Sequence, residues 1–576
     1  MNKQYRVVFN QQRNAFVVVS ENTHIQGKSA CQSQVSSHCG EAVLTAVVAA
    51  TAVGSGVFST SAYAENFTVS SDSKYQVGKA SGEYQNNFFR PGYAGSAGFF
   101  YDQGATNALN IVTGKHSESP SWIEFANVEL NATNDATNLK NMKDSLNMVS
   151  RSNELRQKEA KDENKTIPDL KVTHSAMSIA QIRLDWKKEW KKAGHAPQEG
   201  VAYVSENLAG GFKDGAAAAS GWYSEKTSNG EKGHYYTLVN ASNVVTGSAV
   251  TGPGGRQGGI YLAEWQLNAP YKWKFNGDDK RYTPDEYEAL LDAYIAKTKD
   301  TDGWLFLESG NTVNVKSDVG SQTQVAGGYA VSGKNATNNA VNIDNKANVG
   351  TIYGGYAQKG NVSGNTVNIN GGTVDTVYGG FVVNGAGKVE NNVININGGT
   401  IKEVSLGNTA KTSGTINTNG GTVSGSLKAN GGVLNINAKN NTLKAGSVRG
   451  FDKINFSNLS STHTALQITG NNATDFGDKI TLSGSLNDYN DGKKYSLIQA
   501  ANAISVSENL FAQNTVTDNV FNILSDAQYE VKEFGFHQDD AKKSLYIADE
   551  TGKRNIINKQ FNAADNVKNA VVNINK

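Results

Sequence analysis

The residues of this chain that could do chemistry are histidines and glutamates gathered in four short strings between residues 194 and 235. The strings are Gly194-His195-Ala196-Pro197, Ser205-Glu206-Asn207-Leu208-Ala209, Trp222-Tyr223-Ser224-Glu225 and Gly233-His234-Tyr235. Neutral imidazoles can ligate a divalent ion such as Zn²⁺, and carboxylates beside them can orient the ligands or act as a base towards a metal-bound water. No Gly-x-Ser-x-Gly or Ser-His-Asp string supports hydrolysis by a serine nucleophile.

Apolar spacing predicts that these strings belong to a compact α+β domain over residues 139–268. One helix face steps by 3, 4 and 3 residues through Leu139, Met142, Leu146 and Val149. A second predicted helix starts after a Thr173 cap and carries Ile179, Ile182, Trp186 and Trp190. The pattern also predicts a third helix over Ala216–Glu225 and a strand over Gly259–Gln266.

Two further strings come earlier in the same stretch, Asn153-Glu154-Leu155-Arg156 and Pro168-Asp169-Leu170. In their order, within about 80 residues, the strings resemble those of the CAP superfamily. This is the fold of cysteine-rich secretory proteins, insect antigen 5 and plant pathogenesis-related 1 proteins. The resemblance implies a CAP-like α+β sandwich over residues 139–268.

The same resemblance implies a cavity lined by His195, Glu206, Glu225 and His234. His195 and His234 would then be candidate ligands of a divalent metal, Zn²⁺ or Mg²⁺. Alternatively, packed carboxylates raise one another's pKa and hold a cation weakly. A simpler interpretation also stands: a histidine such as His174 or His195 is a hydrogen-bonded polar residue, and Glu206 anchors a loop.

From about Gly310 onward the chain repeats an apolar–Asn–apolar triplet. The triplets are Val313-Asn314-Val315, Val341-Asn342-Ile343, Val367-Asn368-Ile369, Ile394-Asn395-Ile396, Ile416-Asn417-Thr418 and Leu434-Asn435-Ile436. Their central asparagines are separated by 28, 26, 27, 22 and 18 positions. Between them recur glycine pairs with a neighbouring aromatic residue: Gly327-Gly328-Tyr329, Tyr353-Gly354-Gly355-Tyr356 and Tyr378-Gly379-Gly380-Phe381.

Such a period predicts a solenoid, here a right-handed parallel β-helix in which Val and Ile stack rung on rung. Each triplet puts two apolar side chains on one strand face and Asn on the other. The aromatic residues beside the glycine pairs form either an interior ladder, which we favour, or a ligand-binding surface. The region resembles autotransporter passenger repeats. Patterns at Phe451–Phe456, Lys479–Ser483 and Tyr495–Ile498 are similar to the distal part of such a passenger.

The first 64 residues have the character of a cleavable export signal. An apolar run extends from Ala42 to Val53, and Ala62-Tyr63-Ala64 fits the small-x-small rule for cleavage between Ala64 and Glu65. Met1–Asn10 and Phe16–Glu21 resemble the extended signal-peptide region of type V secretion substrates, which include autotransporters, trimeric autotransporter adhesins and two-partner exoproteins. This resemblance implies export by the Sec machinery and passage through an outer-membrane β-barrel translocator of a Gram-negative bacterium.

Composition limits the remaining possibilities. Both cysteines, Cys31 and Cys39, precede the cleavage site, so the processed chain would have no disulfide, thiolate metal site or cysteine nucleophile. A formal net charge of +1, with dispersed Lys and Arg, gives no footprint for nucleic acid.

These patterns divide the chain into consecutive segments. We expect an extended signal peptide (1–64), a β-rich segment (65–138), a CAP-like domain (139–268), a helical connector (269–305) with an amphipathic helix at Thr283–Lys297, β-helix repeats (306–450), a distal β-rich region (451–554) and a polar tail (555–576). We further expect the sequence to be truncated before a translocator barrel; the alternative is a separate transporter.

The favoured function is that of a secreted or surface-displayed passenger presenting a CAP domain, an adhesin or virulence protein that binds a host surface or matrix ligand. Two alternatives place activity in the CAP cavity, as a metal-assisted hydrolase or as a lipid- or small-ligand-binding module. An enzyme is the less favoured class, and no catalytic residue is assigned.

Overall fold

The computed structural model describes residues 5–10, 15–20, 65–69, 87–114, 128–186, 194–198, 204–267, 279–384, 386–483, 486, 493–512, 521–525 and 528–558. The chain divides into two compact units, Met1–Thr60 and Ser61–Lys576. In the first unit, β1 (Tyr5–Asn10) and β2 (Ala15–Ser20) form an antiparallel hairpin in which Phe9 pairs with Phe16. The apolar run at 42–53, Ala64, Trp190 and the last 18 residues lie outside the described residues.

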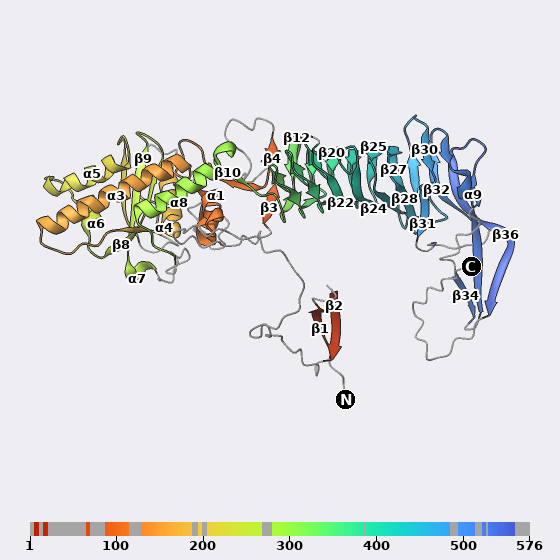
Figure 1. The fold of residues 1–576 in the computed structure, drawn as a ribbon, viewed down its shortest axis with the longest axis horizontal. Coiled ribbons are helices and arrows are strands. Elements are labelled where there is room, and N and C mark those ends of the chain that lie inside the picture. Colours follow the sequence, from red (N-terminus) through yellow and green to blue (C-terminus); the bar gives the residue numbers. More distant parts are fainter. Residues whose placement is uncertain are drawn as a thin grey trace, which may run out of the picture. The chain divides into compact units, whose positions relative to one another are not determined.

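The second unit begins with a region of helices around a small sheet, called the head here and comprising the described residues from 92 to 306 (Figure 1). Its helices are α1 (Gly95–Asp102), α2 (Thr106–Val112), α3 (Leu139–Asp162), α4 (His174–Asp185), α5 (Gly215–Ser224), η2 (Glu225–Thr227), α6 (Gly233–Val239), α7 (Glu264–Leu267), α8 (Pro284–Lys297) and η3 (Lys299–Thr301). Its strands are β5 (Gly92–Ala94), β6 (Lys171–Val172), β7 (Ser205–Gly210), β8 (Asn243–Val250), β9 (Arg256–Ala263) and β10 (Trp304–Phe306).

Local sequence explains where the long helices begin. Asn138 caps α3 by accepting hydrogen bonds from two backbone N–H groups of the first turn. The predicted cap at Thr173 is confirmed, since its side chain accepts from the backbone N–H of Ala176. The helix predicted after Thr283 is α8, where Thr283 and Glu286 form a reciprocal capping box. The predicted third helix corresponds to α5. The strand predicted over Gly259–Gln266 corresponds to β9 only as far as Ala263, because Glu264–Leu267 form α7.

The four-stranded sheet of the head, in the order β6-β8-β9-β7, lies between α3 and α4. Alternate residues of a strand face opposite sides of a sheet. On one side of β8, Ser248 donates a hydrogen bond to the carbonyl of Ser145 in α3. On the other side, a Cβ at Gly247 would lie only 1.9 Å from the carbonyl oxygen of Ala176 in α4. Glycine is therefore required where α4 approaches the sheet.

The segments on either side of residues 139–268 also belong to the core of the head. The sequence predicts a β-rich segment over residues 65–138, but the helices α1 and α2 form within it. Phe99 of α1 is fully buried against Tyr287 and Tyr294 of α8, at ring-centroid distances of 5.6 and 5.8 Å. The helix expected to act as a connector is thus a core element, because burying these rings removes a large apolar area from water.

Residues 312–506 form a parallel β-solenoid of about seven turns. Its strands are β11 (Thr312–Val315), β12 (Asp318–Ala326), β13 (Tyr329–Ala330), β14 (Ala336–Thr337), β15 (Ala340–Ile343), β16 (Asn348–Tyr353), β17 (Tyr356–Ala357), β18 (Val362–Ser363), β19 (Thr366–Ile369), β20 (Thr373–Tyr378), β21 (Phe381–Val382), β22 (Val389–Ile396), β23 (Thr400–Ser405), β24 (Thr412–Thr418), β25 (Thr422–Lys428), β26 (Val433–Asn437), β27 (Leu443–Arg449), β28 (Lys453–Ser457), β29 (Leu466–Ile468), β30 (Thr474–Gly477), β31 (Ile480–Ser483), β32 (Lys494–Ala500) and β33 (Ile504–Val506). The right-handed winding expected from the sequence stays a prediction.

The predicted triplets stack in register along one long sheet, β11-β15-β19-β22-β24-β26-β28-β31. Their first positions form one buried column: Val313, Val341, Val367, Ile394, Ile416, Leu434, Ile454 and Ile480. On the opposite strand face, the central Asn of every triplet after the first donates its amide to the Asn of the preceding rung, for example Asn342 to Asn314 and Asn368 to Asn342, both at 2.8 Å. The predicted division of each triplet between its two faces is confirmed.

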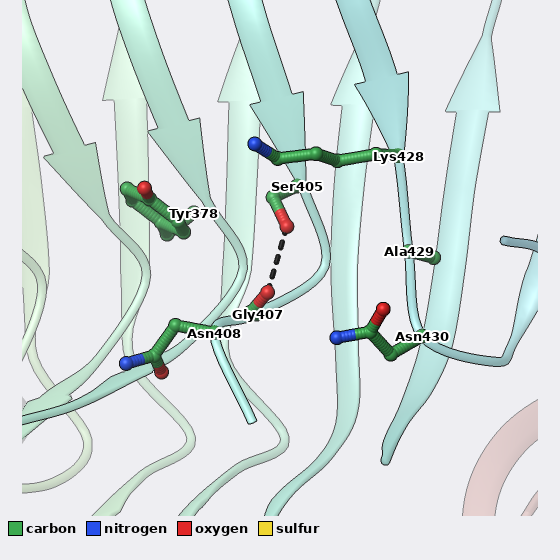
Figure 2. A pocket seen from close by; sticks show the side chains of 7 residues that line it. All are labelled: Tyr378, Ser405, Gly407, Asn408, Lys428, Ala429 and Asn430. Carbon is green, nitrogen blue, oxygen red and sulfur yellow. Dashed lines mark hydrogen bonds between the residues drawn. The ribbon is translucent and has the colours of Figure 1, made fainter. Parts of the chain in front are cut away.

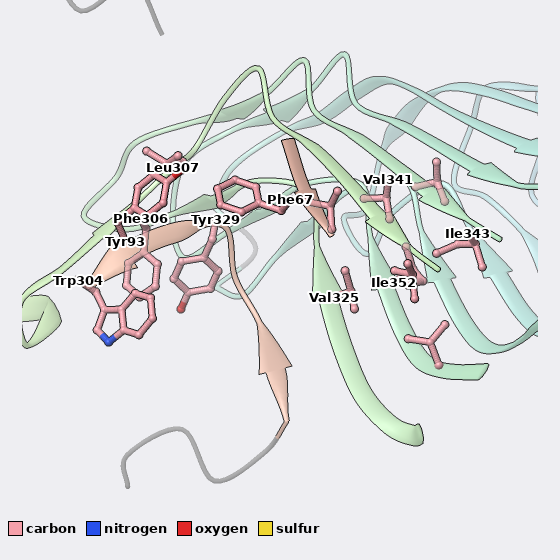
Figure 3. Close-up of a cluster of buried hydrophobic side chains, with 14 of the residues drawn as sticks. Phe67, Tyr93, Trp304, Phe306, Leu307, Val325, Tyr329, Val341, Ile343 and Ile352 are labelled. Carbon is pink, nitrogen blue, oxygen red and sulfur yellow. The ribbon is translucent and has the colours of Figure 1, made fainter. Parts of the chain in front are cut away.

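Strands from distant parts of the sequence cover both ends of the solenoid. β3 (Asn66–Val69) pairs with β11 and β4 (Phe88–Phe89) pairs with β12, so β11 and β12 of the first rung are not edge strands. Figure 3 shows Phe67 beside the apolar side chains of the first rungs and, further along, Tyr93, Trp304 and Phe306 of the head. At the other end, β32 pairs antiparallel with β36 (Ser544–Asn558), which pairs with β35 (Gln528–Gln538) and, through it, β34 (Phe521–Ser525). The short helix α9 (Glu508–Ala512) precedes these strands.

Candidate functional site: two histidine–glutamate pairs

His195 and Glu206 form the first of two pairs that the structure makes from the four predicted residues. His195 Nδ1 lies 2.7 Å from Glu206 Oε2 and donates to it when the carboxyl is ionised. Glu206 is held by β7 and its side chain is only 4% exposed, whereas the His195 side chain is 55% exposed. The pair therefore joins a buried acid to an imidazole at the surface.

Arg183 of α4 explains how a carboxylate is tolerated at this depth. Its guanidinium is fully buried and binds Glu206 through two hydrogen bonds of 2.9 and 3.0 Å. It also donates to the backbone carbonyls of Ala196 and Pro197, which fixes the segment that carries His195. A bidentate Arg–carboxylate contact is among the stronger ion pairs in proteins.

The charges around Glu206 set the protonation of the pair. Burial alone would raise the pKa of Glu206, but the hydrogen bonds and charges of His195 and Arg183 outweigh it, so the pKa is lowered. The hydrogen bond to Glu206 in turn raises the pKa of His195 above its ordinary 6.5. A carboxylate already bound by a guanidinium is a weak base, which favours an orienting role for Glu206 over proton abstraction.

Glu225 and His234 form the second pair. Glu225 begins η2 directly after α5, and His234 lies in the first turn of α6. The His234 Nδ1 atom lies 2.6 Å from Glu225 Oε1, while the backbone N–H groups of His234 and Tyr235 donate to Oε2 at 3.1 and 3.3 Å. The carboxylate thus caps α6 and orients the imidazole at once.

A neighbouring side chain links the element that carries Glu206 to the backbone of His234. Asn207, next to Glu206, donates its amide to the carbonyl of His234 at 2.8 Å. Among the described residues no hydrogen bond or ion pair joins one pair to the other, and no group of three or more His, Cys, Asp or Glu side chains is arranged to hold a metal. In both pairs Nδ1 is engaged by a glutamate, which leaves Nε2 as the atom that a ligand or metal could reach.

The Asn-x-x-Arg string of α3 locks the loops around these pairs. Asn153 exchanges two hydrogen bonds with the backbone of Leu170. Arg156 is fully buried and donates to the carbonyls of Pro168, Leu238, Asn240 and Asn243. Burial lowers the pKa of this guanidinium to about 10, so it stays charged at neutral pH.

Glu159 is a further buried anchor, which the sequence patterns did not predict. Glu159, one helical turn after Arg156, has a fully buried side chain that accepts hydrogen bonds from the hydroxyls of Tyr223 and Tyr235 and from the ammonium of Lys226. It joins α3 to the helices that carry Glu225 and His234. Its only signal in the sequence is its spacing of three from Arg156 on a helix.

His174 is a hydrogen-bonded polar residue, as the simpler interpretation of the sequence predicts. It is buried at the start of α4, and its Nδ1 lies 2.9 Å from the hydroxyl of Tyr287. Burial lowers its pKa to about 4, so the ring is neutral at physiological pH. It is a hydrogen-bonded core residue.

The stacked parallel strands of residues 312–506 define this part of the chain as a β-solenoid, a repeat architecture in which each rung contacts only its neighbours. At the other end of the chain, residues 1–52 match the family model of the extended signal peptide of the type V secretion system. No curated protein and no solved structure matches the chain.

A type V secretion leader and a β-helix fold fit an autotransporter passenger, and the leader indicates Sec-dependent export from a Gram-negative cell to an outer-membrane translocator. No helix within the described ranges is long and apolar enough to cross a membrane.

Proposed function

We propose that the chain is a surface-displayed passenger whose solenoid carries a CAP-like head that contacts host cells or matrix. The observation that carries this proposal is the coincidence of two independent features: a type V leader over residues 1–52 and stacked rungs over residues 312–506. A solenoid suits such a pathway because each rung can add to the one already formed.

The CAP-like assignment of the head is supported by what its strings do. The predicted first-helix string supplies two anchors, Asn153 and Arg156, that hold the loop at Pro168–Leu170. The four predicted cavity residues are grouped as two pairs: His195, in the segment 194–198, with Glu206 of β7, and Glu225 of η2 with His234 of α6. These contacts give each string a structural reason for its residue types.

Surface display and adhesion are tested together in intact Gram-negative cells that express the complete gene. External protease should remove the solenoid and head from wild-type cells, and these cells should bind matrix-coated wells more than cells lacking the gene. Deleting residues 1–64 is the matched control, because it removes the predicted export signal and leaves residues 65–576 intact. Protection of the wild-type chain from external protease, or equal adhesion with and without the gene, would contradict the proposal.

A second candidate function, metal binding in the head, is favoured by the geometry of the two imidazoles. A histidine that ligates a metal commonly donates its other ring nitrogen to a carboxylate, and both His195 and His234 do so. Zn²⁺ titration of the purified chain should show one site that is lost in the His195→Ala, His234→Ala double variant. His537→Gln, a change outside the head, should leave the site intact.

If a site forms, hydrolysis of peptide or ester substrates that disappears in the double variant would favour the enzyme. Metal binding without turnover would favour a ligand-binding module. Zn²⁺ binding that is unchanged in the double variant would remove His195 and His234 from consideration as ligands.

A further inference from the structure

The solenoid has a second long sheet, which includes β16, β20, β23, β25 and β27 in this order. One row of side chains on this sheet changes from aromatic to cationic along the solenoid. In the strand register, Tyr353, Tyr378, Ser405, Lys428 and Arg449 occupy equivalent positions on consecutive rungs. The rings of Tyr353 and Tyr378 stack with centroids 5.6 Å apart and planes 9° from parallel. Ser405 then interrupts the aromatic stack, and the next two rungs carry cations. One face of the Tyr378 ring is therefore left without an aromatic neighbour from the following rung.

A hollow of about 300 Å³ lies at this interruption. It is lined by Tyr378, Ser405, Gly407, Asn408, Lys428, Ala429 and Asn430. Figure 2 shows the ring of Tyr378 on one side of it, with Lys428 extending above Ser405 and the amides of Asn408 and Asn430 along the lower edge. Its volume lies at the lower end of the range for small-molecule sites and would take about one sugar ring.

The polar groups of the hollow keep hydrogen-bonding capacity. Asn408 exchanges hydrogen bonds of 2.9 and 2.8 Å with the backbone of Val382, and Asn430 donates one to the carbonyl of Thr409 at 2.7 Å. A side-chain amide has two N–H donors and two lone pairs, so each retains groups for a ligand while its orientation is fixed. The Ser405 hydroxyl donates a hydrogen bond to the carbonyl of Gly407. This small side chain leaves room for a ligand in the hollow.

Lys428 and Arg449 place positive charge along one side of the hollow. Lys428 is 37% exposed and only loosely paired, with its ammonium 3.9 Å from Glu403. Arg449 follows in the same row on the next rung, about 5 Å further along the stack. An aromatic face, fixed amides and two successive cations are complementary to a ring that carries hydroxyls and an anionic group.

We propose that this hollow, called the Tyr378 hollow, binds an acidic sugar unit of an anionic polysaccharide. The sugar ring stacks on Tyr378, its hydroxyls bind Asn408 and Asn430, and its carboxylate or sulfate binds Lys428, with the next unit reaching Arg449. The proposal rests on the solenoid alone. Surface display can hold while the hollow is empty, and the hollow can bind sugar whatever the head binds.

Isothermal titration of the purified exported chain tests the inference with three probes: polygalacturonate oligomers, sulfated dextran and neutral dextran. We expect the carboxylated or sulfated probe to bind and neutral dextran to bind at least about tenfold more weakly, a difference of about 1.4 kcal/mol. Which anionic probe binds more tightly identifies the acidic group. Salt should weaken binding.

Three variants separate the site from the fold. Lys428→Gln should weaken binding about tenfold, whereas Lys346→Gln, an exposed lysine in the loop after β15, should have no effect. Tyr378→Ala should abolish binding but also removes stacking within the solenoid. Ser405→Tyr therefore serves as the second test: it continues the aromatic ladder into the hollow, so binding should be lost while the melting temperature is retained.

Unchanged binding in Ser405→Tyr, neutral dextran binding as tightly as the anionic probes, or no binding of any probe at millimolar concentration would each overturn the inference. The inference would also be overturned if a single-stranded oligonucleotide bound more tightly than the polysaccharides and lost its binding in the Ser405→Tyr variant. The hollow would then be a nucleic-acid site.

Discussion

The head and the solenoid are stabilised in opposite ways. In the head, single buried charged residues such as Arg156 and Arg183 each bind several separate segments of the chain. In the solenoid, the same contact recurs on rung after rung, as in the buried column through Val313 and the outer asparagine ladder. The head should therefore respond sharply to the loss of one residue, whereas the solenoid should spread the cost over neighbouring rungs.

Tryptophan placement allows the two regions to be followed separately. All seven tryptophans precede residue 305, and Trp186, Trp222, Trp265 and Trp304 lie in the described part of the head. Tryptophan fluorescence therefore contains no signal from residues of the solenoid. Far-ultraviolet circular dichroism reports on the strands of the solenoid as well as on the helices of the head. Urea unfolding with both probes measures the two responses in the same sample.

The largest effect is expected for Arg156→Ala. It leaves four backbone carbonyls without their donor, of which those of Leu238 and Asn243 are in buried hydrogen bonds, and this should lower the free energy of unfolding of the head by about 4 kcal/mol. Arg151→Ala is the matched control on the same helix, where an exposed ion pair with Glu154 is worth under about 1 kcal/mol. Equal losses of unfolding free energy in Arg156→Ala and Arg151→Ala would contradict the role assigned to single buried charges in the head.

Asn365→Ala should produce the next largest effect, this time in the solenoid. Asn311, Asn339, Asn365 and Asn392 form a second, buried ladder with amide–carbonyl distances of 2.8–2.9 Å. Removing Asn365 leaves the buried backbone N–H of Asn339 without its acceptor, so we expect a loss of about 3 kcal/mol.

Asn368→Ala sharpens this prediction, since it lies three residues away on the outer, partly exposed ladder and also contacts both neighbouring rungs. Water can replace its partners, so the loss should be about 1 kcal/mol. A larger loss for Asn368 than for Asn365 would show that burial does not separate the two ladders.

The smallest effect is a pH dependence of the head. The pKa of His195 is raised by its hydrogen bond to Glu206, so the folded state holds this proton more tightly than the unfolded chain. The stabilisation is complete below pH 6.5 and is lost as the pH rises through the raised pKa. His195→Asn should remove that part of the change in melting temperature between pH 6 and 8.

His174 provides the opposite case within the same domain. Its pKa is lowered to about 4 by burial, so its NMR signals should not titrate above pH 6, whereas those of His195 should titrate above the ordinary histidine value. Signals of His195 that titrate below 6.5 would contradict the role assigned to Glu206.

The solenoid could be predicted from the sequence because its contacts follow from the repeat. Equivalent triplet positions pair with one another, so spacing alone gives the register, from Val313 opposite Val341 onward. Even the buried asparagine ladder has a signal, an Asn two residues before each of the first four triplets; Gly414 ends it at the same offset.

The head could be predicted only in part. Helices with a cap or an amphipathic face were found, such as those after Thr173 and Thr283. The helix α1 was missed because it contains glycines and has no side-chain cap; it forms because its apolar residues are buried by α8. Gly98 even allows the Tyr294 ring to approach the helix backbone.

The sequence patterns point to four candidate site residues, whose role as a site stays a prediction, but they give no signal for the ion pair that fixes one of them. Arg183 and Glu206 lie 23 residues apart, and only the folding of α4 against β7 brings them together. Long-range polar contacts of this kind have no periodic signature in a sequence. The spacing of the strings therefore indicated which residues to examine and not how they are held.

The most direct test of the account is to locate the exported chain and determine its first residue. We predict that mass spectrometry of protein released from the surface of intact cells by external protease will recover peptides of the solenoid, and that the full-length surface form begins at Glu65. A chain that stays in the cytoplasm and still begins with Met1 would contradict the account.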